Sequence, residues 1–185
     1  MADRMPPISK DEMTTAQAEA AAAFETSRGY PIFGPFIPLL RSPQLLNASN
    51  SLGLFCRYQS SLPPDISELL ILITSREHTS QVEWAIHFPI AVEKGIAEGA
   101  ALDICNGRPP QGLTDKQYVA WRFASVLLKT KGVPDEEYAE AINVFGEEGV
   151  MDIIGVCGYY TFLAYTLNTA RTPRPDSRAP MLPPL

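Results

Sequence analysis

The chain has 185 residues, of which 45% are hydrophobic and 19% charged, and its 15 basic and 21 acidic side chains give a net charge of −6. This length suits one compact domain with its own core, and the composition is typical of a soluble globular protein. The acidic balance and the lack of a basic cluster argue against nucleic acid and anionic membranes as partners.

Hydropathy and cysteine spacing exclude further classes. The longest uninterrupted apolar run, LLILI at 69–73, is far too short to cross a bilayer. The first residues, MADRMPPISKDEM, do not resemble a secretory signal, so we expect a cytoplasmic protein. Cys56, Cys105 and Cys157 are widely spaced and odd in number, which predicts neither a disulfide framework nor a CxxC pair.

Apolar residues recur at intervals of three and four along nearly the whole chain, and alternating β-branched segments are absent. This pattern predicts an all-α, single-domain fold of about eight helices. Their start and stop signals include the capping-box spacing of Thr14 with Gln17, Pro43 at a first helical position, and Gly95 after a last turn. The expected helices cover about residues 14–27, 43–59, 63–77, 80–95, 97–105, 114–132, 134–146 and 147–168.

Four features of this order bear on packing. The helix over 63–77 is apolar nearly all round, which predicts a buried central helix, whereas the alanine-rich first helix is expected to be peripheral. Residues 28–41 carry two glycines and three prolines among aromatic side chains, and we expect an ordered loop over one end of a pocket. Gly155 and Gly158 suggest a close helix–helix approach. After Asn168 the proline density predicts an extended tail, either disordered or laid over a neighbouring subunit.

The segment SQVEWAIHFPIAVEKG, residues 80–95, carries the main candidates for chemistry. Ser80, Glu83 and His87 lie on one stripe of the expected helix, so Glu83 and His87 can form an acid/base pair. The same residues allow a structural interpretation, because S-x-x-E is also a capping box and an apolar run can simply bury a histidine. Both interpretations stay open from the spacing alone.

Two further residues favour chemistry at His87. Pro89 lies inside the helix and cannot donate to the carbonyl of Ala85, which predicts a bend and a free acceptor beside the histidine. Glu68 lies in the apolar run ISELLILI, where burial favours the protonated acid unless a partner such as His87 or Arg57 is near.

Other kinds of site are less well supported. Glu83 and His87 could share a metal ion, but the second histidine, His78, lies across a helix break, so we expect no metal. No cysteine lies beside a histidine or at an expected helix start, which argues against a thiol nucleophile. Tyr159 and Tyr160 are expected to be packing residues, although one could offer a proton or a hydrogen bond to a substrate.

Three segments together resemble the carboxymuconolactone decarboxylase and alkylhydroperoxidase D-like (AhpD-like) superfamily: FGPFIPLLRSPQLL, SSLPPDISELLILITSREHTSQVEWAIHFPIAVEKGI and FGEEGVMDIIGVCGYYTFLAYTLN. The resemblance implies an AhpD-like helical bundle over about residues 33–170. It leaves 1–32 as an N-terminal extension with a peripheral helix, and 171–185 as a proline-rich C-terminal tail.

The two branches of this superfamily imply different activities. Its peroxidases carry a glutamate followed by CxxCxxxH, which places Glu68 and His87 on matching positions but puts Ser80 and Glu83 where the thiols belong. Disulfide exchange needs two thiols, so peroxidase or peroxiredoxin activity is disfavoured. The decarboxylase branch is similar in keeping Glu-x-x-x-His without the thiols, as in Glu83 and His87. It implies a cofactor-free trimer or hexamer used in aromatic compound catabolism.

We therefore predict a cofactor-independent lyase acting on a small carbonyl- or lactone-containing acid. His87 is the expected proton carrier, Glu83 orients it or shares its proton, and Glu68 is a relay behind them. Central helices that are apolar on more than one face also predict a homo-oligomer. The alternatives are a thiol peroxidase using the three cysteines, and a non-catalytic helical binding or assembly protein. The side chains expected to bind the substrate are Ser80, Trp84, Arg57 and Tyr159.

Overall fold

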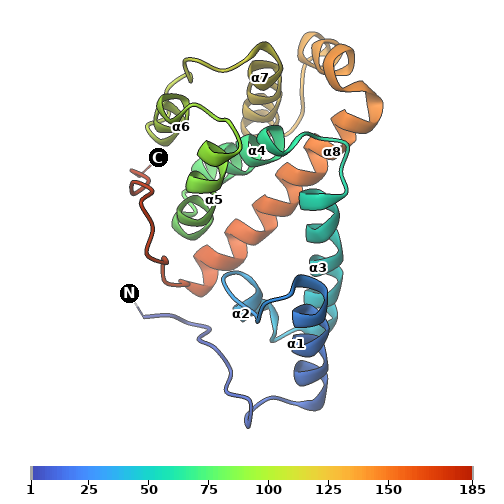
Figure 1. The fold of residues 1–185 in the computed structure, drawn as a ribbon, viewed down its shortest axis with the longest axis vertical. Helices are drawn as coiled ribbons and strands as arrows, with labels where there is room; N and C mark the ends of the chain where they lie inside the picture. The colour runs from blue at the N-terminus through green and yellow to red at the C-terminus, as the bar shows by residue number, and fades with distance from the viewer. Residues whose placement is uncertain (1, 185) are drawn as a thin grey trace.

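A computed structural model describes residues 2–184, which fold into eight helices and no strand (Figure 1). The all-α prediction of about eight helices is therefore confirmed, although one short helix lies within residues 28–41, where a loop was expected, and the last two expected helices form one long element. The helices are α1 (Thr15–Arg28), α2 (Phe36–Leu39), α3 (Pro43–Tyr58), α4 (Pro64–Glu77), α5 (Gln81–Glu93), α6 (Glu98–Cys105), α7 (Asp115–Thr130) and α8 (Asp135–Ala170).

Helix α4 is the centre of the fold, as its all-round apolar sequence predicts. Every residue from Ile66 to Arg76 is buried, and the helix packs most extensively against α5, α7 and α8. Gln117, which closes the capping box at the start of α7, also donates to the Asp65 carboxylate at 2.9 Å. This bond fixes the start of α7 against the first turn of α4.

Helix α8 is the longest element, and its backbone is broken at Gly146, where φ is +70° and ψ is 178°. The two helices expected over 134–146 and 147–168 are therefore present as two segments joined by a kink that suits glycine. By length and composition α8 is the one described helix that could span a membrane, but 56% of its most apolar window is buried within the chain. Such burial is typical of a core helix.

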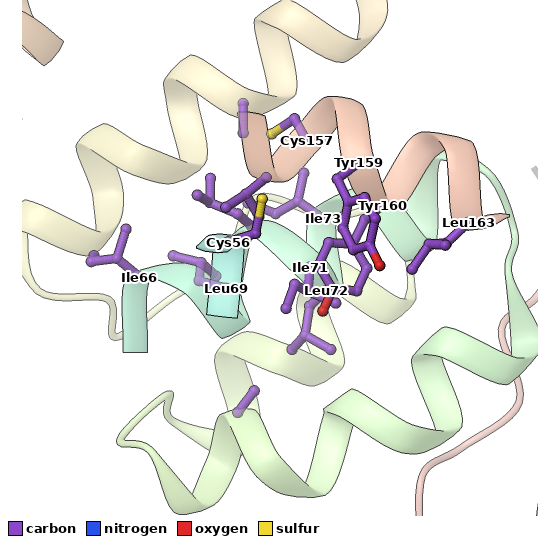
Figure 2. Packing of buried hydrophobic residues seen from close by; sticks show 14 of the residues in the cluster. Cys56, Ile66, Leu69, Ile71, Leu72, Ile73, Cys157, Tyr159, Tyr160 and Leu163 are labelled. Carbon is purple, nitrogen blue, oxygen red and sulfur yellow. The ribbon is translucent and has the colours of Figure 1, made fainter. Parts of the chain in front are cut away.

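One part of the core lies where α3, α4 and α8 meet (Figure 2). Figure 2 shows Cys56 of α3 and Cys157 of α8 among the aliphatic side chains of α4, and Tyr159, Tyr160 and Leu163 further along α8. Both tyrosines are buried and extend toward the part of α5 that carries His87, to whose ring Tyr160 is close. The core thus ends in the candidate site.

The C-terminal tail is extended, as predicted, but it lies on its own chain. Figure 1 shows it running from the end of α8 alongside α5 toward α6. Gln81 exchanges two hydrogen bonds with the backbone of Leu182, at 2.8 and 3.0 Å, and Leu182 is 4% exposed. The alternative of a disordered tail is wrong over the described residues, because α4 and α5 supply polar partners for its backbone.

The glycine expectation is also corrected. A Cβ atom at Gly155 or Gly158 would meet nothing within 4 Å, so neither glycine marks a close approach inside the chain. The close approach is at Gly53 of α3, where a Cβ atom would lie 2.7 Å from Cζ of Tyr159 and 2.8 Å from Nη2 of Arg28. The missing side chain at Gly53 therefore leaves room for Tyr159 and Arg28, which both line the candidate site.

Gly53→Ala should reduce the free energy of unfolding by about 1–3 kcal/mol, because the added Cβ atom displaces the buried Tyr159 ring and the Arg28 guanidinium. Gly99→Ala is the control at an exposed position of α6, where an added Cβ atom meets nothing within 4 Å, and it should instead stabilise by up to about 1 kcal/mol. Urea unfolding followed by circular dichroism measures both values. Equal effects of the two substitutions would contradict the packing described at Gly53.

Candidate active site

The imidazole of His87 lies between two buried carboxylates. Its Nδ1 is 2.7 Å from Oε2 of Glu68 on α4, and its Nε2 is 3.4 Å from Oε2 of Glu83, one turn earlier on α5. His87, Glu68 and Glu83 are 3%, 5% and 2% exposed. The expected pairing of Glu83 with His87 is thus present, and Glu68 extends it into a chain of three titratable groups.

Arg57 of α3 completes the cluster on the other side of Glu68. Its Nη2 donates to Oε1 of Glu68 at 3.4 Å, while Oε2 of the same carboxylate faces His87. The prediction that a buried Glu68 needs His87 or Arg57 as a partner is confirmed, and both serve. Each Glu68 oxygen therefore has a cationic or protonatable neighbour, which offsets the cost of burying the charge.

The predicted capping box at the start of α5 is wrong. Ser80 is at the N-cap position, but its side chain makes no capping bond, and its Oγ and Oε1 of Glu83 are both buried without a partner. The reason is local, because the Ser80 N–H already donates to the Ser75 carbonyl at 2.8 Å and leaves Glu83 nothing to cap. Glu83 is instead turned toward His87, with one carboxylate oxygen uncommitted.

Electrostatics favour a protonated His87. Burial alone would lower its pKa, but attraction to Glu68, hydrogen bonding to Glu68 and Glu83, and the charge of Glu83 outweigh it and raise the pKa from 6.5 to about 9. The imidazole therefore carries a proton at neutral pH. Together with Arg57 it balances the two carboxylates, so the cluster has no net charge when both acids are ionised.

Two tyrosines of α8 complete the polar surroundings. The ring of Tyr160 stands edge-on to His87, with 5.3 Å between ring centroids, and burial raises its pKa well above 10. Burial likewise raises the pKa of Tyr159 to about 12. Both phenols are therefore neutral hydrogen-bond donors at physiological pH, and neither can act as a base there.

A small cavity with a volume of about 30 Å³ lies beside this cluster. That is room for one or two waters and not for an organic substrate. The loop before α2 closes one side with Tyr30, Phe33 and Pro35, so the expected cover over a pocket is confirmed. The full lining is Arg28, Tyr30, Phe33, Pro35, Phe36, Arg57, Glu83, Ile86, His87, Tyr159, Tyr160 and Leu163.

The structure brings only part of the predicted set to this cavity. Arg57 and Tyr159 line it with Glu83 and His87, and Glu68 lies directly behind His87. Ser80 and Trp84 do not line it, so their expected place among substrate-binding residues is not supported. Trp84 is fully buried instead, with its ring 5.6 Å from that of Phe88. Successive side chains on a helix point in different directions, so Trp84 points into the core while its neighbour Glu83 faces the cavity.

Arg28 is the residue that the sequence did not reveal. It is the last residue of α1, where a basic side chain is commonly explained by its favourable interaction with the helix dipole. Its Nε donates to the Asn50 side chain at 2.7 Å, and its Nη2 to the Asn50 carbonyl at 3.4 Å. These neutral acceptors orient the guanidinium without cancelling its charge. Helix α1 is therefore less peripheral than expected, because it supplies a cation to the cavity.

Pro89 leaves the carbonyl of Ala85 without a helical donor, as expected, but the acceptor does not stay free. Proline cannot donate to the carbonyl of Ala85, and Ser177 of the tail donates its hydroxyl to that oxygen at 2.6 Å. The tail therefore satisfies the acceptor left free two residues before His87. Helix α5 continues through Pro89 to Glu93.

The three thiols are poorly suited to redox chemistry. All three cysteines are free and buried, and burial raises the pKa of Cys56 to about 11 and that of Cys157 to about 12. The pKa of Cys105 is also raised by burial. The reactive form of cysteine is the thiolate, which these environments suppress. Among residues 2–184 no group of three or more His, Cys, Asp or Glu side chains is arranged to hold a metal ion.

Comparison with solved structures identifies the fold. The AhpD core of an uncharacterised peroxidase-related protein from Ralstonia eutropha JMP134 superposes with a TM-score of 0.74 and 15% identity, covering 94% of this chain and 92% of that one. The chain has the AhpD-like fold. No protein-family model matches it, and no curated protein is significantly similar in sequence.

Two structures of the debrominase Bmp8 share this fold. One is a variant in complex with 2,3,4-tribromopyrrole, with a TM-score of 0.71, 13% identity and coverage of 94% of this chain and 92% of that one. The other is the apo protein, with a TM-score of 0.71, 13% identity and coverage of 92% and 91%. The matched portion is longer than the 33–170 segment expected from sequence.

The raised pKa of His87 predicts a stability that depends on pH. Because the folded state binds the His87 proton more tightly than the unfolded state does, protonation stabilises the folded protein. This contribution is fully present below about pH 6.5 and is lost as the pH rises through about 9. The free energy of unfolding should fall by up to about 3 kcal/mol across this window. Urea titrations at pH 6, 7.5 and 9 measure it.

Two variants isolate the source of this effect. His87→Gln cannot titrate and should show a nearly flat profile, whereas His78→Gln should keep the fall, since burial lowers the pKa of His78. A wild-type stability that stays constant or rises between pH 6.5 and 9 would show that His87 is not held protonated.

Proposed function

We propose that the chain is a cofactor-independent lyase of the carboxymuconolactone decarboxylase type, acting on a small carbonyl- or lactone-containing acid. The single observation that carries the proposal is the buried Glu68–His87–Glu83 chain at a cavity edged by Arg28 and Arg57. The site brings together the protonated His87, the unpaired Oε1 of Glu83 and the two arginines. The fold neighbours, which include a debrominase, support small-molecule chemistry on this scaffold.

The arginines would bind the substrate acid. Arg28 has five N–H donors, of which two are used by Asn50, so three remain for a ligand. Arg57 spends one contact on Glu68. A carboxylate held by these cations would lie against aromatic and aliphatic side chains, where interactions with developing charge are strong because water is excluded.

The chemistry then needs electrons to move and a proton to arrive. As the C–C bond to the carboxylate breaks, CO2 leaves and the bonding electrons pass into the neighbouring carbonyl or lactone as an enolate or dienolate. A proton delivered to the substrate carbon completes the product. His87 holds this proton at neutral pH, and Glu83, whose Oε1 is uncommitted, would pass it to the cavity. Glu68 would keep the imidazole oriented and stabilise its charge.

An organic substrate requires the cavity to widen, because its present volume of about 30 Å³ admits only water. Movement of the covering loop would widen the cavity with the smallest loss of buried contacts, because Phe33 in this loop is already 37% exposed. The α8 side chains on the cavity wall are buried in the core. Under this proposal the loop closes after binding and removes water from the site.

Peroxidase activity through the cysteines is the weaker alternative. The raised pKa values of the buried Cys56 and Cys157 thiols leave almost no thiolate at neutral pH. A Cys56→Ser, Cys105→Ser, Cys157→Ser variant should therefore retain lyase turnover, and the wild type should show no peroxide turnover above that variant.

Assembly and location extend the proposal. We propose a cytoplasmic homo-oligomer, a trimer or hexamer, because two helices in mutual contact expose apolar side chains. On α3 these are Leu45, Leu52 and Phe55, and on the second segment of α8 they are Met151, Ile154 and Tyr165. Apolar surface of this kind is typical of an interface between copies.

His87→Gln should lower turnover by about 10² or more while the fold survives, because the proton carrier is lost. Glu83→Gln should do the same, since the amide cannot transfer the proton. Release of CO2 from a panel of carboxylated γ-lactones and β-keto acids provides the assay. Glu93→Gln is the matched control, an exposed glutamate on the same helix. Full turnover in a folded His87→Gln protein would refute the assignment.

Sedimentation velocity at micromolar concentration should show a trimer or hexamer. Leu52→Glu combined with Met151→Glu places charges in the apolar surface and should shift the protein toward monomers. Tyr138→Glu, at an exposed position on the first segment of α8, should leave the assembly intact. A stable wild-type monomer would contradict the oligomer.

A further inference from the structure

A second and larger cavity lies between α4, α6 and α7. Its volume is about 440 Å³, within the range of small-molecule sites, and it shares no residue with the His87 cavity. The apolar part of its wall consists of Ile73, Ile104, Trp121 and Val126. We call this cavity the Trp121 cleft. A flat apolar group would find an indole ring and aliphatic side chains there.

Arg76 is the unusual member of the Trp121 cleft. It is only 9% exposed, its Nη1 donates to the Pro183 carbonyl at 2.8 Å, and its Nε is buried without a partner. Among residues 2–184 no carboxylate lies within 4.0 Å of this guanidinium. A buried cation without an anion among the described residues is costly, and a guanidinium has five donors, of which one has a partner in this part of the chain.

The other charged groups of the cleft leave Arg76 as its principal anion receptor. Arg108 is paired with Asp103, and Arg122 is paired with a group of glutamates at the start of α8. Lys129 is exposed at the rim and forms no ion pair within the described part of the chain. Glu77 is the one acidic side chain in the lining. The unpaired charges are thus mainly positive, in a chain whose net charge is −6.

We propose that the Trp121 cleft binds a small organic anion with a flat apolar body. Its carboxylate pairs with the guanidinium of Arg76, assisted by Lys129, and its ring packs against Trp121. The ligand supplies the missing counter-charge and covers apolar wall at the same time, which a simple inorganic anion cannot do. The site is independent of the chemistry at His87, because neither cavity needs the other to be filled.

Binding of 2-naphthoate, compared with neutral 2-naphthamide, tests the proposal. The chain has two tryptophans, so the ¹H–¹⁵N spectrum contains two indole resonances, and Trp121→Phe identifies the one of interest. 2-Naphthoate should shift the Trp121 resonance and leave that of Trp84 in place, with at least tenfold higher affinity than the amide. Equal affinities, or no shift at Trp121, would overturn the proposal.

Variants separate the charge from the fold. Arg76→Gln should weaken 2-naphthoate binding at least tenfold and leave 2-naphthamide binding unchanged. Lys129→Gln should weaken it about twofold to fivefold, and Lys94→Gln, an exposed lysine at the end of α5, should have no effect. If Arg76→Gln fails to fold, Ser125→Phe fills the cleft from α7 and should abolish binding. Undiminished binding in a folded Ser125→Phe protein would overturn the proposal.

The chain's own C-terminal carboxylate is the competing anion, because Pro183 already contacts Arg76. A chain extended by Gly-Gly-Ser-Gly moves that carboxylate away and should bind 2-naphthoate with unchanged affinity. A tenfold gain in the extended chain would show that Arg76 serves the terminus, and would overturn the assignment of an exogenous ligand.

Discussion

The structure depends on one interaction, the placement of the His87 imidazole between the buried carboxylates of Glu68 and Glu83. Either acid alone would be expensive to bury in its charged form, and so would the imidazolium. Together with Arg57 they form an alternating row of two cations and two anions drawn from three helices. The cost of burying each charge is offset by the next, so α3, α4 and α5 are held in one relation to each other. The arrangement that stabilises the helices is also the one that stores a proton.

The rest of the chain is arranged around that row. Gly53 lets Tyr159 and Arg28 approach α3, and Asn50 on the same helix holds the Arg28 guanidinium in place. Pro89 has no N–H to donate to the carbonyl of Ala85, and the hydroxyl of Ser177 in the tail donates to that oxygen instead. The tail therefore supports α5 although Ser177 and Ala85 are 92 residues apart in sequence. A buried charged cluster of this kind needs support from residues outside it.

Much of the fold could be predicted from sequence because its signals are local. The capping box at Thr14, the proline at position 43 and the apolar run of α4 act within one or two turns, and each helix is present. The site was only partly predictable. The stripe of Glu83 and His87 follows from helical spacing, but the failed cap at Ser80 depends on a bond to Ser75 in the preceding turn. Arg28, Gly53 and the course of the tail depend on contacts between distant segments, which no local pattern encodes.

The central claim, that His87 is held as an imidazolium between two carboxylates, is tested most directly by ¹⁵N NMR of histidine-labelled protein titrated with pH. The chain has two histidines, so the experiment contains its own reference. The account predicts that His87 stays protonated at both nitrogens through neutral pH and titrates near 9, while His78 loses its proton below 6.5. A neutral His87 ring at pH 7, titrating together with His78, would contradict it.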